Sequence, residues 1–176
     1  YFDSRVVFVS ETGPKDNRTK RLAIMDQDGA NFRLLKHPPS LVIAPRFSPT
    51  TNKIIFTGYE TGKPRVYLMD LSSEEITSLP ELKGMSFAPR FSADGSQIVL
   101  SMTENGNTDI FVNTLAFGTK RRLTTNIAID TAPSFSPDGK SIVFESDRGG
   151  GQQLYIISTQ GGEAKRISVG KGRYAT

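Results

Sequence analysis

The sequence has no cysteine and one histidine among its 176 residues. The lack of cysteine excludes disulfide bonds, thiolate metal sites and cysteine nucleophiles. The single histidine, His37, excludes metal sites built from several histidines, and any serine catalytic triad would have to use it. Neither the nucleophile elbow G-x-S-x-G nor the P-loop of nucleotide-binding proteins occurs. The sequence therefore contains none of these catalytic signatures.

Long apolar runs and a strong excess of one charge are missing as well. No apolar run approaches the length of about 18 residues that marks a membrane-spanning helix, so direct membrane insertion is not expected. The 22 lysines and arginines exceed the 18 aspartates and glutamates by only 4. Because the basic residues are also dispersed, no nucleic-acid partner is expected. The 16 glycines and 10 prolines are scattered, which leaves few places for a long helix and favours turn-rich β structure.

The chain repeats itself with a period of 44 residues. The segment that begins Ala-Pro-Arg-Phe-Ser at Ala44 returns at Ala88, and it returns as Ala-Pro-Ser-Phe-Ser at Ala132, so both steps are 44 (88 − 44 and 132 − 88). A period of this length is typical of repeat architectures. Three further columns keep the same step: Ile54, Ile98 and Ile142; Tyr67, Phe111 and Tyr155; Leu79, Leu123 and Ile167.

Each repeat predicts four short strands. The first is the Ala-Pro-x-Phe-Ser segment, and a Ser-Pro-Asp-Gly turn or a variant of it follows. In this turn the proline presets φ, the aspartate caps the backbone and the glycine accepts a positive φ. The second, third and fourth strands are expected at these ranges: Lys53–Phe56, Gln97–Leu100 and Ser141–Phe144; Arg65–Asp70, Asp109–Asn113 and Gln153–Ser158; Glu75–Leu79, Lys120–Thr124 and Ala164–Ser168.

Four antiparallel strands in each repeat predict an all-β fold, a β-propeller of 44-residue four-stranded blades. Residues 1–176 form one propeller in this interpretation, in which the first blade, 1–43, lacks its innermost strand and the others span 44–87, 88–131 and 132–176. Because an unclosed propeller leaves exposed edges, the chain is expected to belong to a larger propeller or to self-associate. Two aromatic columns are expected to form the core between blades: Phe47, Phe91 and Phe135; Tyr67, Phe111 and Tyr155.

One side of such a propeller is the candidate functional face. The loops between second and third strands emerge there, together with the connections between blades, because the strands alternate in direction. Three connections are unusually apolar for loops: Ser40–Ile43, Gly84–Phe87 and Ile127–Thr131. They lead into the innermost strands and so surround the mouth of the central channel. Two interpretations stay open: these residues form a protein-binding patch, or they pack between blades.

Two loop features on this side are further candidates. His37 lies between the fourth strand of one blade and the first strand of the next. The segment Glu11–Lys20 is basic and longer by 4 residues than its equivalents, since Phe8 to Phe56 spans 48 residues and Phe56 to Leu100 spans 44. Loops on a rigid scaffold often carry binding function, and a solvated hairpin tip is the alternative for this segment.

The repeat contains the pattern Ala-Pro-x-Phe-Ser-Pro-Asp-Gly-x-x-Ile-x-Phe, followed by Tyr-(Ile/Leu)-x-x-(Asp/Ser) and Arg-(Ile/Leu)-(Ser/Thr). The segments Arg5–Gly13 and Lys20–Asn31 add a distinctive first blade. Together these patterns resemble the propeller of the TolB family of the bacterial Tol–Pal envelope system. Prolyl-oligopeptidase-type serine peptidases share the repeat, so the propeller domain of such a peptidase, with its catalytic domain outside this chain, is the alternative.

The resemblance implies a six-bladed propeller, of which about four blades are present, and an N-terminal α/β domain outside this chain. It implies a non-catalytic, periplasmic protein whose channel face binds the peptidoglycan-associated lipoprotein Pal. TolA would be contacted through the N-terminal region, which is absent here, and colicin-type peptides would use the Pal site. The system supports outer-membrane integrity and cell division. No cofactor is expected, and Ca²⁺ in the channel is the one alternative left open.

Partner-contacting positions in the TolB family lie just before the Ala-Pro strands. The offset from the motif carries these positions onto Met85, Ser86, Phe87, Ala88, Asp130 and Thr131, with His37, Val42 and Ile43 as the analogous candidates of the first connection.

Overall fold

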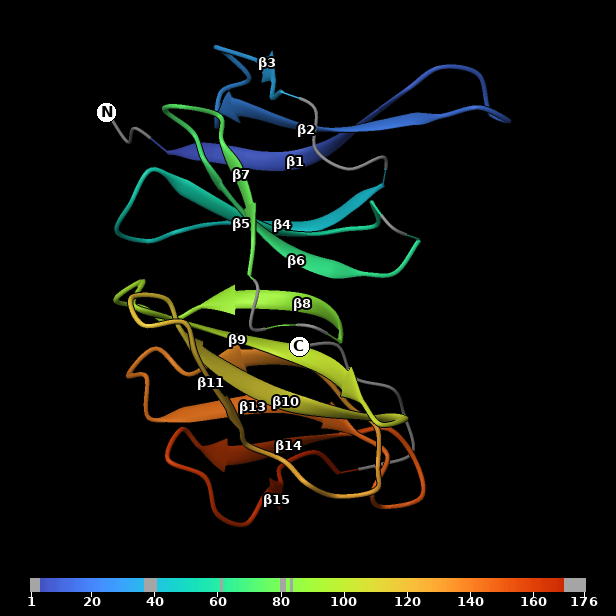
Figure 1. Cartoon of the computed structure of the whole chain (residues 1–176), viewed down its shortest axis with the longest axis vertical. Helices are drawn as coiled ribbons and strands as arrows, with labels where there is room; N and C mark the ends of the chain where they lie inside the picture. Colours follow the sequence, from blue (N-terminus) through green and yellow to red (C-terminus); the bar gives the residue numbers. More distant parts are fainter. Residues whose placement is uncertain (1–3, 37–40, 61, 80–81, 83, 170–176) are drawn as a thin grey trace.

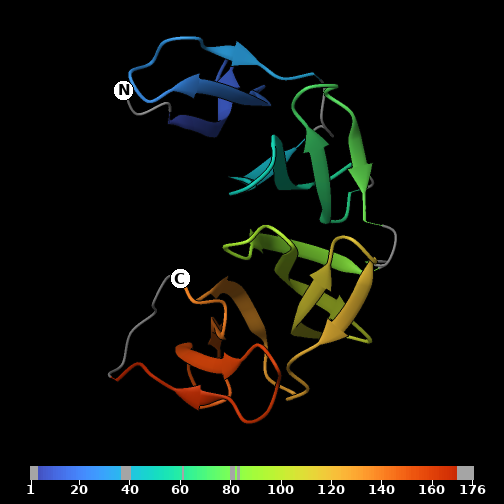
Figure 2. The same cartoon turned by 90° about the vertical axis from the view of Figure 1, so that its left-hand side faces the viewer.

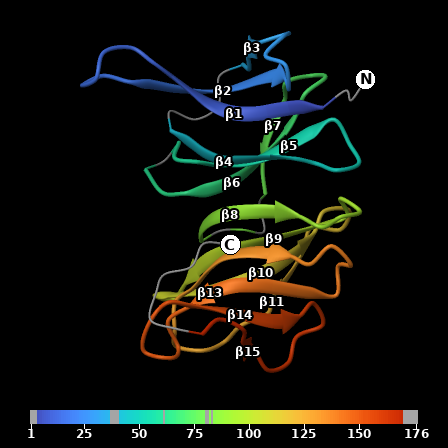
Figure 3. The same ribbon diagram turned by 180° about the vertical axis from the view of Figure 1, so that it is seen from behind.

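The computed structural model describes residues 4–36, 41–60, 62–79, 82 and 84–169. Within these residues the regular structure consists of fifteen strands in four antiparallel sheets. In every sheet the strands are hydrogen-bonded in chain order, so each sheet is a simple meander. Figures 1 and 3 show the sheets following one another along the longest axis of the molecule.

Sheet 1 has three strands and the other sheets have four. Sheet 1 contains β1 (Arg5–Thr12), β2 (Thr19–Asp26) and β3 (Arg33–Leu34). Sheet 2 contains β4 (Val42–Phe47), β5 (Lys53–Gly58), β6 (Arg65–Asp70) and β7 (Ile76–Ser78). Sheet 3 contains β8 (Met85–Phe91), β9 (Gln97–Glu104), β10 (Asn107–Thr114) and β11 (Thr119–Arg122). Sheet 4 contains β12 (Asp130–Phe135), β13 (Ser141–Ser146), β14 (Gln153–Ser158) and β15 (Lys165–Arg166).

The four sheets follow one another around an arc, with β4 and β8 on its inner side and β7 and β11 on its outer side (Figure 2). The innermost strands of neighbouring sheets contact one another, β4 with β8 and β8 with β12. This is the blade arrangement of a β-propeller, so the predicted all-β propeller of four-stranded blades is confirmed. The second strands begin at the predicted residues, Lys53, Gln97 and Ser141.

The hydrophobic core lies between the sheets, because both faces of the inner sheets are covered. Successive residues of a strand point to opposite faces. Accordingly, Ile54 packs in the cluster between sheets 1 and 2, and Ile55 packs in the cluster between sheets 2 and 3. In sheet 3 the same division separates Ile98 from Val99. Two-sided burial explains why the second strands are continuous apolar runs.

The two aromatic columns form part of this core, as predicted. Tyr67, Phe111 and Tyr155 are all buried, and the Phe56 and Tyr67 rings stack with centroids 5.7 Å apart. The other column is only partly buried and packs against the three clusters between sheets: Phe47, Phe91 and Phe135.

Each Ala-Pro pair forms a β-bulge in an innermost strand. Ala44 and Pro45 stand opposite the single residue Phe56, because Ile43 pairs with Thr57 and Arg46 pairs with Ile55. The same shift occurs once in β8 and once in β12. The repeated alanines have left-handed backbones, with φ of 51°, 52° and 50° for Ala44, Ala88 and Ala132. The motif is therefore a device for bending the innermost strand.

The innermost strands begin earlier than the sequence predicted. The residues before the Ala-Pro pairs were expected to be connections, and that expectation is wrong for the segments Val42–Ile43, Met85–Phe87 and Asp130–Thr131, which belong to β4, β8 and β12. These residues pair with the ends of the second strands, as Asp130 does with Ser146. The reason is the bulge, which lets pairing continue on both sides of the proline that lacks an N–H group.

The long segment Glu11–Lys20 extends a hairpin. Pairing of β1 with β2 continues as far as Thr12 and Thr19. The Glu11 carboxylate forms ion pairs with Lys20 Nζ (2.7 Å) and Arg18 Nη1 (3.5 Å). The hairpin projects from the side of sheet 1 (Figure 1). Across the described residues, no helix is long and apolar enough to span a membrane.

Candidate functional site

The candidate site consists of the first residues of β4, β8 and β12, which lie at the channel mouth. The first residues of these strands pair with the last residues of β5, β9 and β13, from which the second-to-third-strand loops leave. The connection before β12 is fixed to this region, because the Ile129 amide donates to Asp147 Oδ1 at 2.9 Å. The innermost strands and these loops therefore share one rim, as the alternation of strand direction requires.

The rim carries exposed apolar side chains. Met85 is 38% exposed, Ile129 is 56% exposed and Ile127 is 97% exposed, and Ile43 is also exposed. We call these four side chains the mouth residues. Phe87, Ala88 and Thr131 are partly exposed beside them. Apolar groups of this size on an otherwise rigid rim are a feature of protein-binding surfaces.

Three of the predicted contact residues lie inside the protein. Val42, Ser86 and Asp130 are 0–1% exposed, so the expectation that they are available at the surface is wrong. They occupy equivalent positions in the three strands and point toward the packed face. Ser86 shows their role, since its hydroxyl accepts a hydrogen bond from Val66 N (3.1 Å) and its amide donates to Pro64 O (3.0 Å). His37 lies outside the described residues.

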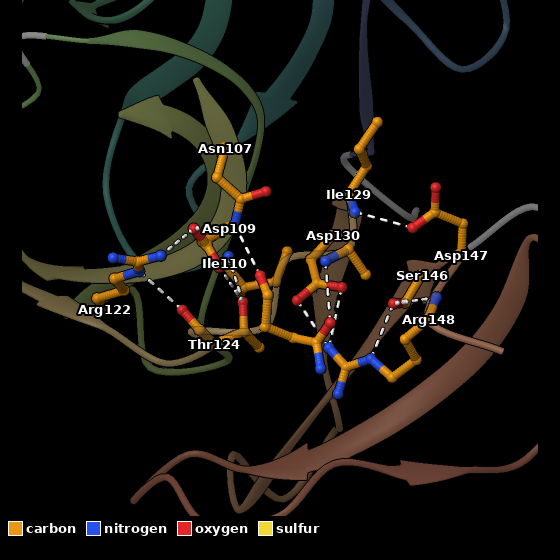
Figure 4. A network of polar contacts seen from close by, with 12 residues as sticks. Asn107, Asp109, Ile110, Arg122, Thr124, Ile129, Asp130, Ser146, Asp147 and Arg148 are labelled. Carbon is orange, nitrogen blue, oxygen red and sulfur yellow. Dashed lines mark hydrogen bonds and ion pairs between the residues drawn. The ribbon is translucent and has the colours of Figure 1, made fainter. Parts of the chain in front are cut away.

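Asp130 forms a buried ion pair with Arg148, which follows β13 (Figure 4). Arg148 Nη2 donates to both carboxylate oxygens, at 2.9 and 2.7 Å, and Nε donates to Ser146 Oγ at 2.9 Å. The guanidinium carbon lies 5.3 Å from the ring centre of Phe144 and 4.9 Å from that of Tyr155. This arrangement anchors the start of β12 and hence the position of Ile129.

A second polar network lies in sheet 3 (Figure 4). Asp109 is buried and accepts hydrogen bonds from Arg122 Nη2 (2.5 Å), Asn107 Nδ2 (3.0 Å) and Thr124 Oγ1 (3.3 Å). Burial raises the pKa of Asp109, and the charge of Arg122 opposes that rise. The Thr124 hydroxyl also accepts a hydrogen bond from Ile110 N, so the network ties Thr124 to the start of β10.

Sheet 4 repeats this network with a neutral acceptor. Gln153 Oε1 accepts from Arg166 Nη2 (2.8 Å) and Ser168 Oγ (2.7 Å), and Ser168 Oγ accepts from Leu154 N. Arg166 and Ser168 stand 44 residues after Arg122 and Thr124. The Arg-(Ile/Leu)-(Ser/Thr) signature of the repeat therefore stabilises the blade from within.

Sequence reasoning missed Arg148 as the partner of Asp130. Asp147, the residue before Arg148, accepts a hydrogen bond from the Ile129 amide of the preceding connection. No repeat signal could identify Arg148, because the equivalent residues in sheets 3 and 2 are Glu104 and Glu60.

No metal site emerges from the described part of the chain. Among those residues, no group of three or more Asp, Glu or His side chains is placed to hold a metal ion. The channel mouth is suited to binding another protein through apolar contacts and strand edges.

Comparison with known proteins identifies the family to which this propeller is similar. A family model described as the TolB beta propeller domain matches residues 1–176. The Tol–Pal system protein TolB of Cereibacter sphaeroides is 64% identical over 81 residues, which are 46% of this chain and 18% of that protein. The crystal structure of TolB from Acinetobacter baumannii superposes with a TM-score of 0.82 at 31% identity, over 99% of this chain and 44% of that one.

More distant structures share the fold alone. Tricorn protease superposes on 89% of this chain with a TM-score of 0.66 at 16% identity. The chain spans less than half the length of the Cereibacter sphaeroides and Acinetobacter baumannii TolB proteins. Since the family model covers every residue, this chain belongs to the TolB β-propeller family.

Proposed function

We propose that this chain is a non-catalytic, protein-binding propeller of the Tol–Pal system that binds the lipoprotein Pal at its channel mouth. Membership of the TolB family supports the system to which it is assigned. One observation supports the position of the binding site: the mouth residues are exposed. They lie on β4 and β8 and in the connection before β12: Ile43, Met85, Ile127 and Ile129. Exposed apolar side chains held by a rigid rim lose little conformational entropy when a partner covers them.

The proposal has consequences for the whole protein. The protein would act in the periplasm, where it would support outer-membrane integrity and cell division. TolA would bind to a region outside these 176 residues, and colicin-type peptides would compete for the Pal site. Binding would need no cofactor, so Ca²⁺ should leave the Pal affinity unchanged.

Two features favour binding over catalysis. The sequence contains no cysteine, and its single histidine is the only residue that could serve as the base of a serine triad. The peptidase alternative rests on shared fold alone, because tricorn protease is only 16% identical to this chain. A catalytic domain encoded beside this propeller in the same gene would favour that alternative.

A binding experiment with matched variants tests the proposal. In the full-length protein, Met85→Asp and Ile129→Asp should each weaken Pal binding at least about tenfold, which corresponds to about 1.4 kcal/mol. Phe117→Asp is the control, because Phe117 is an exposed apolar residue in the turn between β10 and β11, away from the rim. Calorimetry with soluble Pal, in Ca²⁺ and in chelator, measures all four proteins. Loss of affinity in the control but not at the rim would contradict the assignment.

A further inference from the structure

Two arginines stand at equivalent positions on neighbouring innermost strands. Arg46 in β4 pairs with Ile55, and Arg90 in β8 pairs with Val99, so both follow the bulge of their strand in the same register. Because β4 and β8 contact each other on the inner side of the arc (Figure 2), the two residues belong to one stretch of the channel wall. Ser134 takes this position in β12.

Arg90 is subject to two effects that disfavour its charge. The pKa of Arg90 is lowered by burial and by the positive charge of Arg46. Arg46 is exposed and Arg90 is half-buried. Each Nη1 donates to the carbonyl of the preceding proline, at 2.7 Å to Pro45 and 3.1 Å to Pro89. These two contacts hold both side chains back along their strands.

Neither arginine is neutralised within the described part of the chain. No carboxylate there lies within ion-pair distance of Arg46 or Arg90, whereas Arg122 and Arg148 both have aspartate partners. A guanidinium has five N–H donors in a planar fork, so most donors of both residues are available to a ligand. An anion that both residues reach from the channel would offset their like charges and accept several of these donors at once.

The bulge brings the arginines onto the same strand face as apolar residues of the rim. Phe87 pairs with Ser101 and Arg90 pairs with Val99, and since Ser101 and Val99 are two residues apart, Phe87 and Arg90 share a face. Met85, opposite Thr103, shares that face as well. Without the extra residue of the bulge, Phe87 and Arg90 would point to opposite faces.

We propose that Arg46 and Arg90 form a carboxylate-binding site in the channel, which takes an acidic side chain from the protein partner while an apolar residue of the same segment covers the mouth. This inference rests on the proposed function and names the chemistry of the partner. From Thr103 to Val99 the second strand advances four residues, or about 13 Å at about 3.3 Å per residue. An extended segment with an apolar and an acidic residue about four positions apart matches that spacing. A free anion would use the arginines but gain nothing from Met85 and Phe87.

Pal binding by the full-length protein tests this site. Arg46→Gln and Arg90→Gln should each weaken binding at least about tenfold, since each removes a charge-assisted hydrogen-bond donor. The affinity of both variants should also depend less steeply on salt. Arg90→Lys keeps the charge without the fork and should fall between wild type and Arg90→Gln. The control is Arg33→Gln, which removes the same charge at the outer strand β3, where Arg33 pairs with Glu74.

The outcomes separate the two proposals. Wild-type affinity and salt dependence in both glutamine variants would overturn the carboxylate site and leave Pal binding at the rim intact. Failure of wild-type protein to bind Pal would overturn the proposed function, and citrate then tests the arginines directly. In that case, citrate should raise the melting temperature of wild type more than that of the double glutamine variant. An equal rise in both proteins would overturn the site, and a comparable rise with phosphate would point to a free-anion site instead of a partner's carboxylate.

Discussion

Replacement of Asp130 with alanine is expected to lower the free energy of unfolding by about 3–5 kcal/mol. The Asp130 carboxylate is fully buried, and both of its oxygens accept hydrogen bonds from Arg148. The Arg148 side chain is only 16% exposed, so water can solvate little of its charge once the carboxylate is gone. The variant therefore strands a cation in the interior, whereas breaking a surface pair costs at most about 1 kcal/mol.

The surroundings of Arg148 allow the stranded charge to be tested directly. Arginine stays protonated in proteins, and its guanidinium lies over the rings of Phe144 and Tyr155. Combining Asp130→Ala with Arg148→Met removes the charge and leaves an apolar chain between the two rings. The double variant should be more stable than Asp130→Ala alone, although it has lost more hydrogen bonds. This non-additivity is the signature of a buried pair.

Urea unfolding of the full-length protein, followed by far-ultraviolet circular dichroism, measures these free energies. Glu11→Ala is the control, because its ion pairs with Lys20 (2.7 Å) and Arg18 (3.5 Å) lie at the surface, and their loss should cost far less than the loss of the buried pair. Hydrogen exchange at the Ile129 amide gives a local reading of the β12 start, which should open in Asp130→Ala. The reasoning is refuted if Asp130→Ala costs no more than the control, or if the two single changes add.

Four other changes test separate parts of the structure. Asn113→Leu should raise the free energy of unfolding by about 1–3 kcal/mol, because the buried Asn113 amide has no hydrogen-bond partner within the described residues and Met69 fills the equivalent position in sheet 2; destabilisation would contradict this. Ala88→Gly should stay within about 1 kcal/mol of wild type and Ala88→Val should cost more than about 2 kcal/mol, since φ is 52°; equal losses would show that this backbone angle does not matter. Hydrogen bonds from Ser92 and then Ser96 lower the pKa of Asp94 from 3.8 to about 2, so its contribution to stability is complete above about pH 4 and is lost as the pH falls through about 2; Asp94→Asn should flatten that acid limb of the melting temperature, and identical limbs would count against the assignment. The 176-residue chain alone should self-associate through its exposed end faces, and sedimentation as a monomer at all concentrations would disprove this.

The repeat made most of the fold predictable from the sequence. A column such as Ile54, Ile98 and Ile142 reports the same environment three times, and all three residues are fully buried. Agreement between copies removes the ambiguity of short apolar segments, for which periodicity alone cannot separate a strand from a buried helix. The turns were equally readable, because Gly95 and Gly139 adopt the positive φ that the Asp-Gly pairs predicted.

The site was less predictable, because its geometry depends on contacts between distant residues. Ser86 and Asp130 look like exposed polar residues in a connection, yet strand pairing extends past the bulge and turns both side chains inward. The partner of Asp130 comes from a hairpin 18 residues later, and no copy of the repeat contains the same pair. Local pattern gives no access to an ion pair that occurs once in the chain.

The repeat also separates the exposed residues that suggest function from those that reflect an end of the arc. Ile167 is 50% exposed, but its equivalent Leu123 is only 7% exposed because sheet 4 covers it, so the exposure of Ile167 reports an uncovered sheet face. Met85 admits no such explanation, since sheet 3 is packed on both faces. Its side chain is exposed because its strand starts at the rim, beyond the reach of either neighbour. Exposure that persists between two packed sheets is the stronger indication of a binding surface, and it selects Met85 over Ile167.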